Sequence, residues 1–323
     1  ERAPDLLARR AEVDLVAGHG AARALPRLLE EAATGLLPGK VAAPEGTPAE
    51  VLLASRPGEG GGPRTRAFLK VQDGCRRRCA FCIVPSLRGS ERSAPAAEVE
   101  EAIHALASAG APEVVLCGVH LAAFGSERGE SLLGLLRRLA ARPPACRVRL
   151  SSLEPMEAGE ELVELAASGT VVAPHLHLPL QSGSDAVLRR MRRGITAARF
   201  RALLERAARV NPRVHLATDL IAGFPGETAA EAAETEAFVG GLPLASLHVF
   251  PFSPRTGTPA AAAAAAAGVP PAEAARRAAR LRSFDDGFRR RYAAAHDGVE
   301  ADVVALHGGV GLTEPYVEAA LPP

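Results

Sequence analysis

Short apolar runs alternate with longer amphipathic segments along most of the chain, beginning near residue 66. The apolar runs have the length and composition of strands buried in a sheet, and six recur in order: 66–72, 113–119, 147–153, 172–180, 214–224 and 244–252. Between and after them the spacing of apolar residues predicts helices over 94–110, 131–142, 158–168, 184–194, 196–210, 228–242 and 271–295.

Six successive strand–helix units predict parallel strands with helices outside them. The unusual residues lie just beyond the carboxyl end of each predicted strand. These loops are the one that contains Cys75, then GVHLAAFG, SSLEP, QSGSD, GFPGET and SPRTGTP. An open doubly wound sheet would concentrate such features at one switch point, whereas functional loops at the same end of every strand are typical of a βα barrel. We therefore expect an α/β fold of the partial (β/α)6 barrel type.

Composition adds limits to this picture. The formal net charge is only +1, so charge alone gives no argument for a nucleic-acid partner, and hydrophobic residues make up 47% of the chain. The first residues, ERAPDLLARR, are charged and do not form a secretory leader, and no charge-free apolar stretch of about 18 residues is present. Five cysteines without a disulfide-like spacing indicate a reducing compartment. We expect a soluble, cytoplasmic protein and, because the first residue is not Met, a fragment of a longer one.

Three of the five cysteines lie within eight residues, in the string GCRRRCAFC. Thiolates bind soft metals, so Cys75, Cys79 and Cys82 on one loop can share a metal centre. A structural zinc site usually takes four ligands in paired C-x2-C spacing, and no fourth ligand follows nearby. A [4Fe–4S] cluster held by three cysteines keeps one iron open to a substrate or cofactor, which we favour over zinc or thiol redox chemistry. Cys117 and Cys146 lie on predicted strands and are interpreted as small buried apolar residues.

The cysteine motif and the six strand–helix units together resemble the radical S-adenosylmethionine superfamily. Four strings are similar, in order and spacing, to its methylthiotransferase family: GCRRRCAFCIVPSLRGSERS, HLPLQSGSDAVLRRMRRG, TDLIAGFPGET and FSPRTGTPA. The resemblance covers about residues 66–296. Within the family, VRLSSLEP and LHVFPFSPRTGTPA resemble the branch that acts on tRNA N6-threonylcarbamoyladenosine beside the anticodon.

The resemblance implies two cofactors: a [4Fe–4S] cluster on Cys75, Cys79 and Cys82, and S-adenosylmethionine on its open iron. It implies that one S-adenosylmethionine supplies a methyl group to sulfur. A second yields a 5'-deoxyadenosyl radical, which abstracts hydrogen from C2 of the adenine, so that C–S–CH3 replaces C–H. The cofactors carry this chemistry, while the protein positions the base and excludes water.

The family's cofactor-binding positions carry over to six residues of this chain: Phe81, Glu154, Gln181, Ser182, Ile221 and Gly223. Phe81 stands where the family lays a residue against the adenine, and Ile221 and Gly223 are expected to line the same pocket. The other three follow the third and fourth strands and are expected to hydrogen-bond the ribose or the methionine end. His175 and His177 alternate along the fourth strand, so they share a face as a polar lining or as core histidines.

Arginines crowd two loops at the predicted active-site face. Arg88 belongs to the cysteine loop, and a second group comprises Arg189, Arg190, Arg192 and Arg193. Two basic groups at one mouth are expected to contact phosphates, and a single-stranded anticodon loop can splay a base into such a mouth. We therefore expect the tRNA anticodon loop as a partner. An electron donor such as flavodoxin or ferredoxin, a monomeric chain and no membrane complete the expected setting.

The resemblance also divides the chain into segments. Residues 1–37 resemble the end of the family's N-terminal domain, and the Gly- and Pro-rich residues 38–65 form a linker. Residues 66–296 form the radical S-adenosylmethionine core, and 297–323 resemble part of a TRAM-like RNA-binding β-barrel. The family's N-terminal domain holds a second cluster on three more cysteines, and this sequence has none before Cys75. We therefore expect this chain to bind one cluster and cleave S-adenosylmethionine without completing thiomethylation.

Other functions stay open on the sequence alone. A methylthiotransferase of the same family that acts on another tRNA adenosine, or on a ribosomal protein, would share the cysteine motif, although SSLEP argues against the ribosomal-protein type. A zinc-stabilised RNA-binding module would have no catalytic role, and the missing fourth ligand argues against it. Metal identity and product analysis separate these alternatives.

Overall fold

The computed structural model describes residues 13, 15–17, 25–34, 41–42, 53–55, 65–306 and 308–321. Near the N-terminus it contains β1 (Val16–Ala17), α2 (Leu25–Ala33) and β2 (Val41–Ala42), with β1 and β2 parallel. A short strand and a helix therefore lie within residues 1–37. The remainder of that segment, and most of the expected linker, lie outside the described residues.

Six parallel strands form the centre of the molecule, as the apolar runs predict. The strands are β4 (Ala67–Asp73), β6 (Glu113–Gly118), β7 (Arg147–Leu150), β8 (His175–His177), β9 (His215–Ala222) and β10 (Ser246–Pro251). They divide into two hydrogen-bonded sheets, with β4, β6 and β7 in one and β8, β9 and β10 in the other. The α/β class is confirmed. Closure into a single partial (β/α)6 barrel stays a prediction, because no continuous ladder joins β7 to β8 among the described residues.

Single backbone hydrogen bonds still connect the two sheets. The amide of Ala173 donates to the carbonyl of Val148 over 2.7 Å, and the amide of Leu153 donates to the carbonyl of His177 over 2.9 Å. Two short strands pair antiparallel with β4: β3 (Leu53–Ser55) and β5 (Arg92–Ser93). The first of these lies inside the segment expected to be a linker, so that segment contributes a strand to the sheet.

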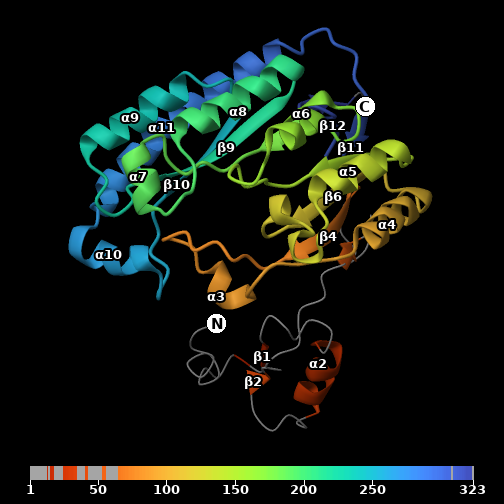
Figure 1. Cartoon of the computed structure of the whole chain (residues 1–323), viewed down its shortest axis with the longest axis horizontal. Coiled ribbons are helices and arrows are strands. Elements are labelled where there is room, and N and C mark those ends of the chain that lie inside the picture. The colour runs from red at the N-terminus through yellow and green to blue at the C-terminus, as the bar shows by residue number, and fades with distance from the viewer. Residues whose placement is uncertain are drawn as a thin grey trace.

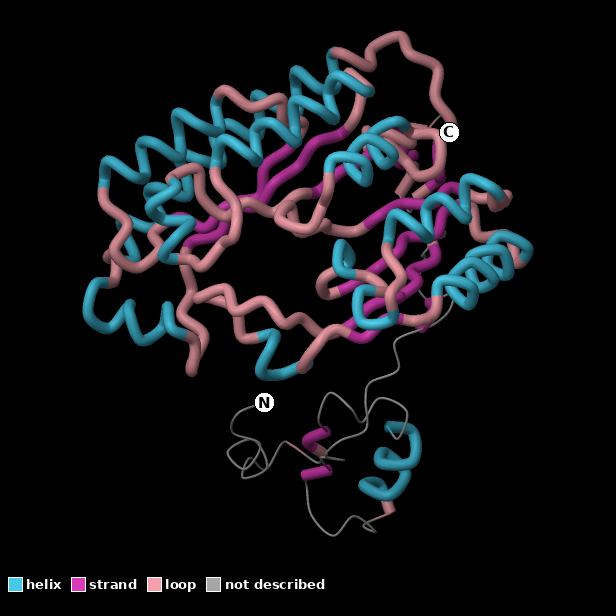
Figure 2. Tube along the Cα trace, viewed as in Figure 1, coloured by secondary structure: helices cyan, strands magenta, loops and turns pink. Residues whose placement is uncertain are grey.

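Helices follow the strands in the order that the sequence predicts. They are α3 (Val84–Arg88), α4 (Ala96–Ser108), α5 (Leu132–Ala141), α6 (Glu160–Ser168), α7 (Asp185–Arg190), α8 (Ala197–Val210), α9 (Ala229–Gly240), α10 (Pro259–Ala267) and α11 (Pro271–Ala294), with 3₁₀ turns η3 (Leu121–Ala123) and η4 (Ser126–Arg128). Figure 1 and Figure 2 show α8, α9 and α11 along the sheet of β9 and β10, and α4 and α5 beside that of β4 and β6. Capping side chains fix the beginning of some helices. At α9, for example, Thr228 and Glu231 form a capping box. Among the described helices, none is long and apolar enough to cross a membrane.

The hydrophobic core lies between the sheets and these helices. Fully buried side chains such as Leu69, Leu116 and Leu135 come from strands and helix faces that the apolar pattern marks. A second, smaller cluster contains Ala80, Val187, Met191, Phe224 and Ala260. Burial of such residues contributes about 25 cal/mol per Å² of apolar surface. The second cluster fixes the cysteine loop against α7 and α10.

The C-terminal segment forms an antiparallel sheet of β11 (Val303–Ala305), β12 (Val310–Thr313) and β13 (Glu318–Ala320). It docks at the amino-terminal end of the parallel strands, where Arg147 donates to the carbonyl of Leu312 over 3.0 Å and Arg149 donates to that of Glu314 over 3.0 Å. Tyr316, at the turn before β13, lies with its ring 5.0 Å from the Arg149 guanidinium carbon. These short strands cover one end of the molecule's centre.

Candidate active site

The three clustered cysteines lie on the loop that follows β4, and the local sequence fixes the start of that loop. Gly74 has a φ of 75°, and a Cβ there would lie 2.0 Å from the carbonyl oxygen of Ser90, so only glycine fits. The buried carboxylate of Asp73 accepts the Gly74 amide at 2.8 Å and pairs with Lys70 and Arg88, each at 3.1 Å. These contacts hold the backbone as it enters the cysteine motif.

The cysteine thiols lie close enough to influence one another. Cys79 is buried, while Cys75 and Cys82 are partly buried. Burial raises the pKa of the Cys75 thiol to about 11, and charge repulsion from Glu91 and from the other two thiols adds to this effect. Burial also raises the pKa of Cys82, again with repulsion from Cys79. Three thiolates here need a positive centre between them, which is what an iron–sulfur cluster provides.

The other two cysteines take no part in this site. Cys117 lies on β6, and burial alone raises its pKa to about 11. Cys146 comes just before β7 rather than on it, and it packs against the hydrophobic core. Both are partly buried, not fully buried as the sequence suggests. The donor set of the loop is therefore three thiols, which fits a cluster with one open iron.

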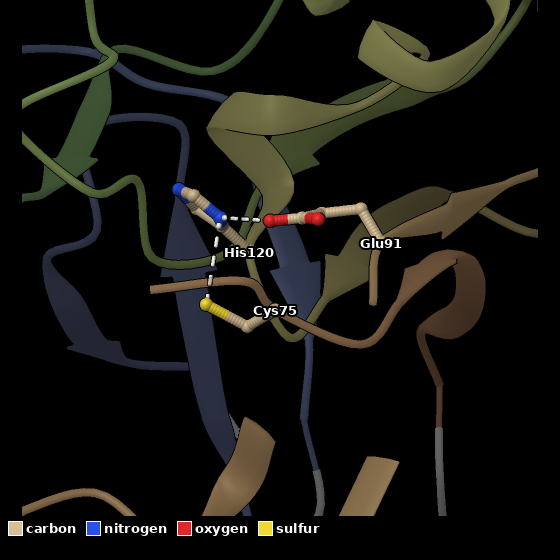
Figure 3. Close-up of side chains that lie close together, drawn as sticks. All are labelled: Cys75, Glu91 and His120. Atoms are coloured by element: carbon tan, nitrogen blue, oxygen red, sulfur yellow. Dashed lines mark hydrogen bonds and ion pairs between the residues drawn. The ribbon is translucent and has the colours of Figure 1, made fainter. Parts of the chain in front are cut away.

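A histidine that the sequence analysis missed lies against the first cysteine. Figure 3 shows the His120 imidazole between the Cys75 thiol and the Glu91 carboxylate, with Nδ1 3.6 Å from each. On its other side, Nε2 lies 3.2 Å from a carboxylate oxygen of Glu157. Gln72 holds the backbone of His120 in place, because its side-chain oxygen accepts a hydrogen bond from the His120 amide at 2.7 Å. The only signal in the sequence is a histidine in the polar loop after the second predicted strand.

Arg193 requires a correction. It was expected on a solvent-facing basic rim, but its side chain is only 2% exposed. Its Nη1 lies 3.7 Å from the Sγ of Cys79, and its Nη2 lies 2.7 Å from Oε2 of Glu154. The pair with Glu154 is a close ion contact without hydrogen-bond alignment, so Oε2 of Glu154 and Nε of Arg193 stay buried without a hydrogen-bond partner among the described residues. Unused polar atoms beside a cysteine ligand are suited to a polar cofactor.

A cavity of about 330 Å³ lies beside the cysteine loop. Three of the six predicted cofactor-binding residues do not line it, and three do: Phe81, Gln181 and Ile221. Gln181 has a φ of 87°, unusual for a residue with a side chain, and its backbone is held by hydrogen bonds to Asp219 and Ile221. Asp219 and Arg255 complete the polar part of the lining.

The remaining predicted residues lie elsewhere. Glu154 faces Arg193, as described above. Ser182 is 1% exposed, and its hydroxyl is engaged with Thr235 at 3.2 Å. Gly223 has a φ of 76° and faces α11, where an added Cβ would lie 2.4 Å from the Cβ of Ala274. The structure thus gives Ser182 and Gly223 packing and backbone roles outside this cavity.

Asp219 also belongs to a polar chain that the sequence analysis missed. Its Oδ1 lies 2.9 Å from Nε2 of His177 and 3.2 Å from Nδ1 of His248, and Ser152 Oγ lies 2.6 Å from Nδ1 of His177. Burial by itself would raise the pKa of Asp219, but the hydrogen bonds from the two histidines lower it to about 2. A single carboxylate in the apolar run TDLIAGF was the available signal.

The four arginines predicted to contact RNA fall into two kinds. Arg190 forms two bonds to the Glu231 carboxylate, at 2.9 and 2.7 Å, and Arg88 pairs with Asp73. Arg189 and Arg192 are exposed, and neither forms an ion pair with any residue that the structure describes. Two of the four therefore have their charge available to an anion.

Comparisons with known proteins agree with this geometry. The profile of the Radical SAM superfamily matches residues 69–239. The threonylcarbamoyladenosine tRNA methylthiotransferase MtaB of Bacillus subtilis is 37% identical over 75% of this chain and 53% of its own length. The tRNA-2-methylthio-N(6)-dimethylallyladenosine synthase of Erythrobacter litoralis is 36% identical over 80% of this chain and 57% of its own length. The chain therefore spans a little over half the length of these relatives.

A solved structure shares the fold. The radical S-adenosylmethionine methyltransferase TsrM from Kitasatospora setae superposes with a TM-score of 0.50, covering 59% of this chain and 37% of that one. At 17% sequence identity the likeness concerns the fold alone.

Proposed function

The chain belongs to the radical S-adenosylmethionine superfamily, whose profile covers over half of it, and from this premise we propose that it is a tRNA methylthiotransferase. It would insert a methylthio group at C2 of N6-threonylcarbamoyladenosine, next to the anticodon. The superfamily uses a [4Fe–4S] cluster and S-adenosylmethionine. The observation that carries the proposal is a set of three thiols, with no fourth, beside a cavity that Phe81 lines.

In this proposal Cys75, Cys79 and Cys82 hold the cluster. When bound, the cluster would supply the electron for the reductive cleavage of S-adenosylmethionine. Arg193 fixes Cys79 through its contact to the sulfur, and His120 does the same for Cys75. Both residues act on the orientation of the ligands.

The cavity residues orient S-adenosylmethionine. Phe81 and Ile221 offer apolar surface to the adenine, and Gln181 offers an amide to the ribose. The unused atoms of Glu154 and Arg193 suit the charged amino-acid end of the molecule. Ser182 and Gly223 then contribute only indirectly, through the backbone that they shape.

The substrate is a proposal that rests on the relatives, because they are named for tRNA adenosines. The dimethylallyladenosine type is the second candidate, since the two kinds of relative are 37% and 36% identical to this chain. We also propose a flavodoxin or ferredoxin as electron donor, and a monomeric chain.

Arg189 and Arg192 would contact the RNA backbone. Replacing both with Gln is expected to weaken tRNA binding and to lower the slope of log affinity against log salt by about two, without changing the iron content. The matched control is Arg137→Gln on α5, which removes an exposed arginine already paired with Glu161. An unchanged salt slope in the double variant would contradict the proposed contact of Arg189 and Arg192 with the RNA backbone.

Hydrogen abstraction at C2 tests the function directly. The reconstituted chain is given S-adenosylmethionine, a reductant and tRNA whose N6-threonylcarbamoyladenosine carries deuterium at C2. We expect deuterium in the 5'-deoxyadenosine. Formation of 5'-deoxyadenosine without deuterium would contradict the proposal, and this readout does not require thiomethylation to be completed.

A further inference from the structure

The relatives leave one property of the substrate undecided, namely the group on N6 of the adenosine. One kind of relative is named for a threonylcarbamoyl group and the other for a dimethylallyl group, at 37% and 36% identity. The first group carries a urea, a hydroxyl and a carboxylate, while the second is a hydrocarbon. A pocket for the first therefore needs polar atoms with free hydrogen-bonding capacity, and a pocket for the second needs none.

A cavity of about 430 Å³ lies between the two sheets. Ser152, His177 and His248 lie at the end nearest the carboxyl ends of the strands, and Tyr292 and Tyr316 line the opposite end. Both His177 and His248 bond to Asp219, which itself lines the cavity beside Phe81. The two cavities thus share a wall made of one carboxylate and its two histidines, and a substituent on a base held beside the cysteine loop would meet the larger cavity at this wall.

Three residues that line this larger cavity each have a polar atom that is buried without a hydrogen-bond partner among the described residues: Ser151 Oγ, His175 Nδ1 and His215 Nδ1. His215 is only 6% exposed. An unpaired buried polar group lowers stability, and three of them at one site indicate that a ligand completes them. They come from the ends or starts of three different strands, so no local turn accounts for the grouping.

The two imidazoles are neutral and can therefore both donate and accept. Burial lowers the pKa of His215 to about 3 and holds that of His175 well below its usual value. A neutral imidazole has one N–H and one lone pair, which matches a hydroxyl or urea group. Their rings are also fixed: His175 stacks on Tyr316 with centroids 4.3 Å apart, and His215 meets Tyr292 edge-on at 5.1 Å.

The charged groups around the cavity favour an anion. Arg66, Arg149 and Arg289 line it, against the single carboxylate of Glu318. All three are already paired: Arg66 and Arg149 with Glu113, at 3.4 and 2.8 Å, and Arg289 with Asp285, at 2.7 Å. Even with these pairings, a lining that contains three guanidinium groups is more suitable for a polar or charged substituent than for a hydrocarbon.

Given the proposed function, on which this inference rests, we propose that this histidine-lined cavity binds the polar N6 substituent of the substrate adenosine. Ser151, His175 and His215 would be the residues that select threonylcarbamoyl over dimethylallyl. They act on substrate choice rather than on S-adenosylmethionine cleavage, since none of them contacts a cysteine ligand.

Titration calorimetry with two free nucleosides tests the idea. The reconstituted chain is expected to bind N6-threonylcarbamoyladenosine at least tenfold more tightly than N6-dimethylallyladenosine. Comparable affinities, or a preference for the dimethylallyl nucleoside, would overturn this inference and leave the methylthiotransferase proposal intact. Binding of neither nucleoside would also overturn this inference, whereas the deuterium transfer described above tests the proposed function separately.

Two substitutions then locate the preference. Ser151→Ala removes an unpaired hydroxyl, and His215→Phe keeps a ring against Tyr292 while removing both nitrogens. Each is expected to lower affinity for the threonylcarbamoyl nucleoside by about tenfold, to leave the dimethylallyl affinity unchanged, and to keep the melting temperature. His104→Phe is the control, because His104 on α4 also has an unpaired buried nitrogen but lies away from the cavity. Equal effects of all three variants would overturn the assignment.

Discussion

The cysteine loop and the histidine-lined cavity lie next to each other, yet they differ in how far the chain itself pairs their polar groups. On the loop, Asp73 is surrounded by cations, Arg76 pairs with Glu91 at 2.5 Å, and Arg193 is held between Glu154 and Cys79. In the cavity, three buried polar atoms have no partner among the described residues. Ion pairs within the chain thus hold most of the loop, although Oε2 of Glu154 and Nε of Arg193 lack a hydrogen-bond partner among the described residues. We infer that the cavity, in contrast, is completed by what binds in it.

The largest effect is expected from the loop. Cys79→Ala removes a buried ligand, so iron is lost and S-adenosylmethionine cleavage falls below about 1% of wild type. Formation of 5'-deoxyadenosine under reducing conditions measures this. Cys146→Ala is the control, since Cys146 packs against the core away from the loop. Cleavage of S-adenosylmethionine that persists in Cys79→Ala would contradict the role of Cys79 as a cluster ligand.

The next effect tests whether the loop is organised without a ligand. Arg193→Met leaves Glu154 without its buried partner, and we expect the free energy of unfolding of the apoprotein to fall by about 2 kcal/mol. Urea denaturation measures the change. Arg206→Met removes an arginine that pairs with Glu160 and Glu164 on the surface, and it should cost at most about 1 kcal/mol. Equal losses of unfolding free energy in the two variants would mean that the buried Arg193–Glu154 contact stabilises the protein no more than a surface ion pair does.

The cavity should respond with the opposite sign. Ser151→Ala removes an unpaired buried hydroxyl, so the free energy of unfolding is expected to stay the same or to rise by up to about 1 kcal/mol. Thermal unfolding of the apoprotein measures this. A loss of more than about 1 kcal/mol would mean that the hydroxyl already has a partner in the folded chain.

The smallest effect concerns pH at the wall between the two cavities. A hydrogen bond to Asp219 raises the pKa of His248, although its burial and Arg289 oppose this. The stability it contributes is complete below pH of about 6.5 and is lost as the pH rises through the raised value. In the unchanged protein, the free energy of unfolding should therefore fall by about 0.5 kcal/mol between pH 6 and 8 because of this bond, and in His248→Gln this fall should be absent. The value is small because half of the His248 side chain is exposed. Urea denaturation at both pH values measures the difference.

Asp219 affects the stability of the protein at low pH. Its pKa of about 2 means that its contribution is complete above pH of about 4 and is lost as the pH falls toward 2. The contacts of Asp219 and His248 therefore both contribute fully between pH of about 4 and 6.5.

The sequence predicts the six strands and the helices between them, because burial on one or both faces leaves a pattern over a few residues. It also locates the three cysteines, because they are neighbours in the chain. It does not predict the division into two sheets or the short helix α3, which depend on long-range packing. Arg193 shows the limit most clearly: it belongs to a run of arginines, and only the fold shows that this member turns inward to Cys79.

The same limit applies to the cavity. His177, Asp219 and His248 come from three strands, and the first two lie 42 positions apart. Alternation along the strand indicates that His175 and His177 share a face, and both do line the same cavity. Nothing in the sequence shows which of their nitrogens lack partners, because that depends on every residue packed around them.

The metal content of the chain tests the central claim most directly. After anaerobic reconstitution with iron and sulfide, the account predicts about four irons and four acid-labile sulfides per chain, held by Cys75, Cys79 and Cys82. Zinc without sulfide would contradict it. That result would remove the radical chemistry and leave a zinc-stabilised RNA-binding module as the better interpretation of the loop.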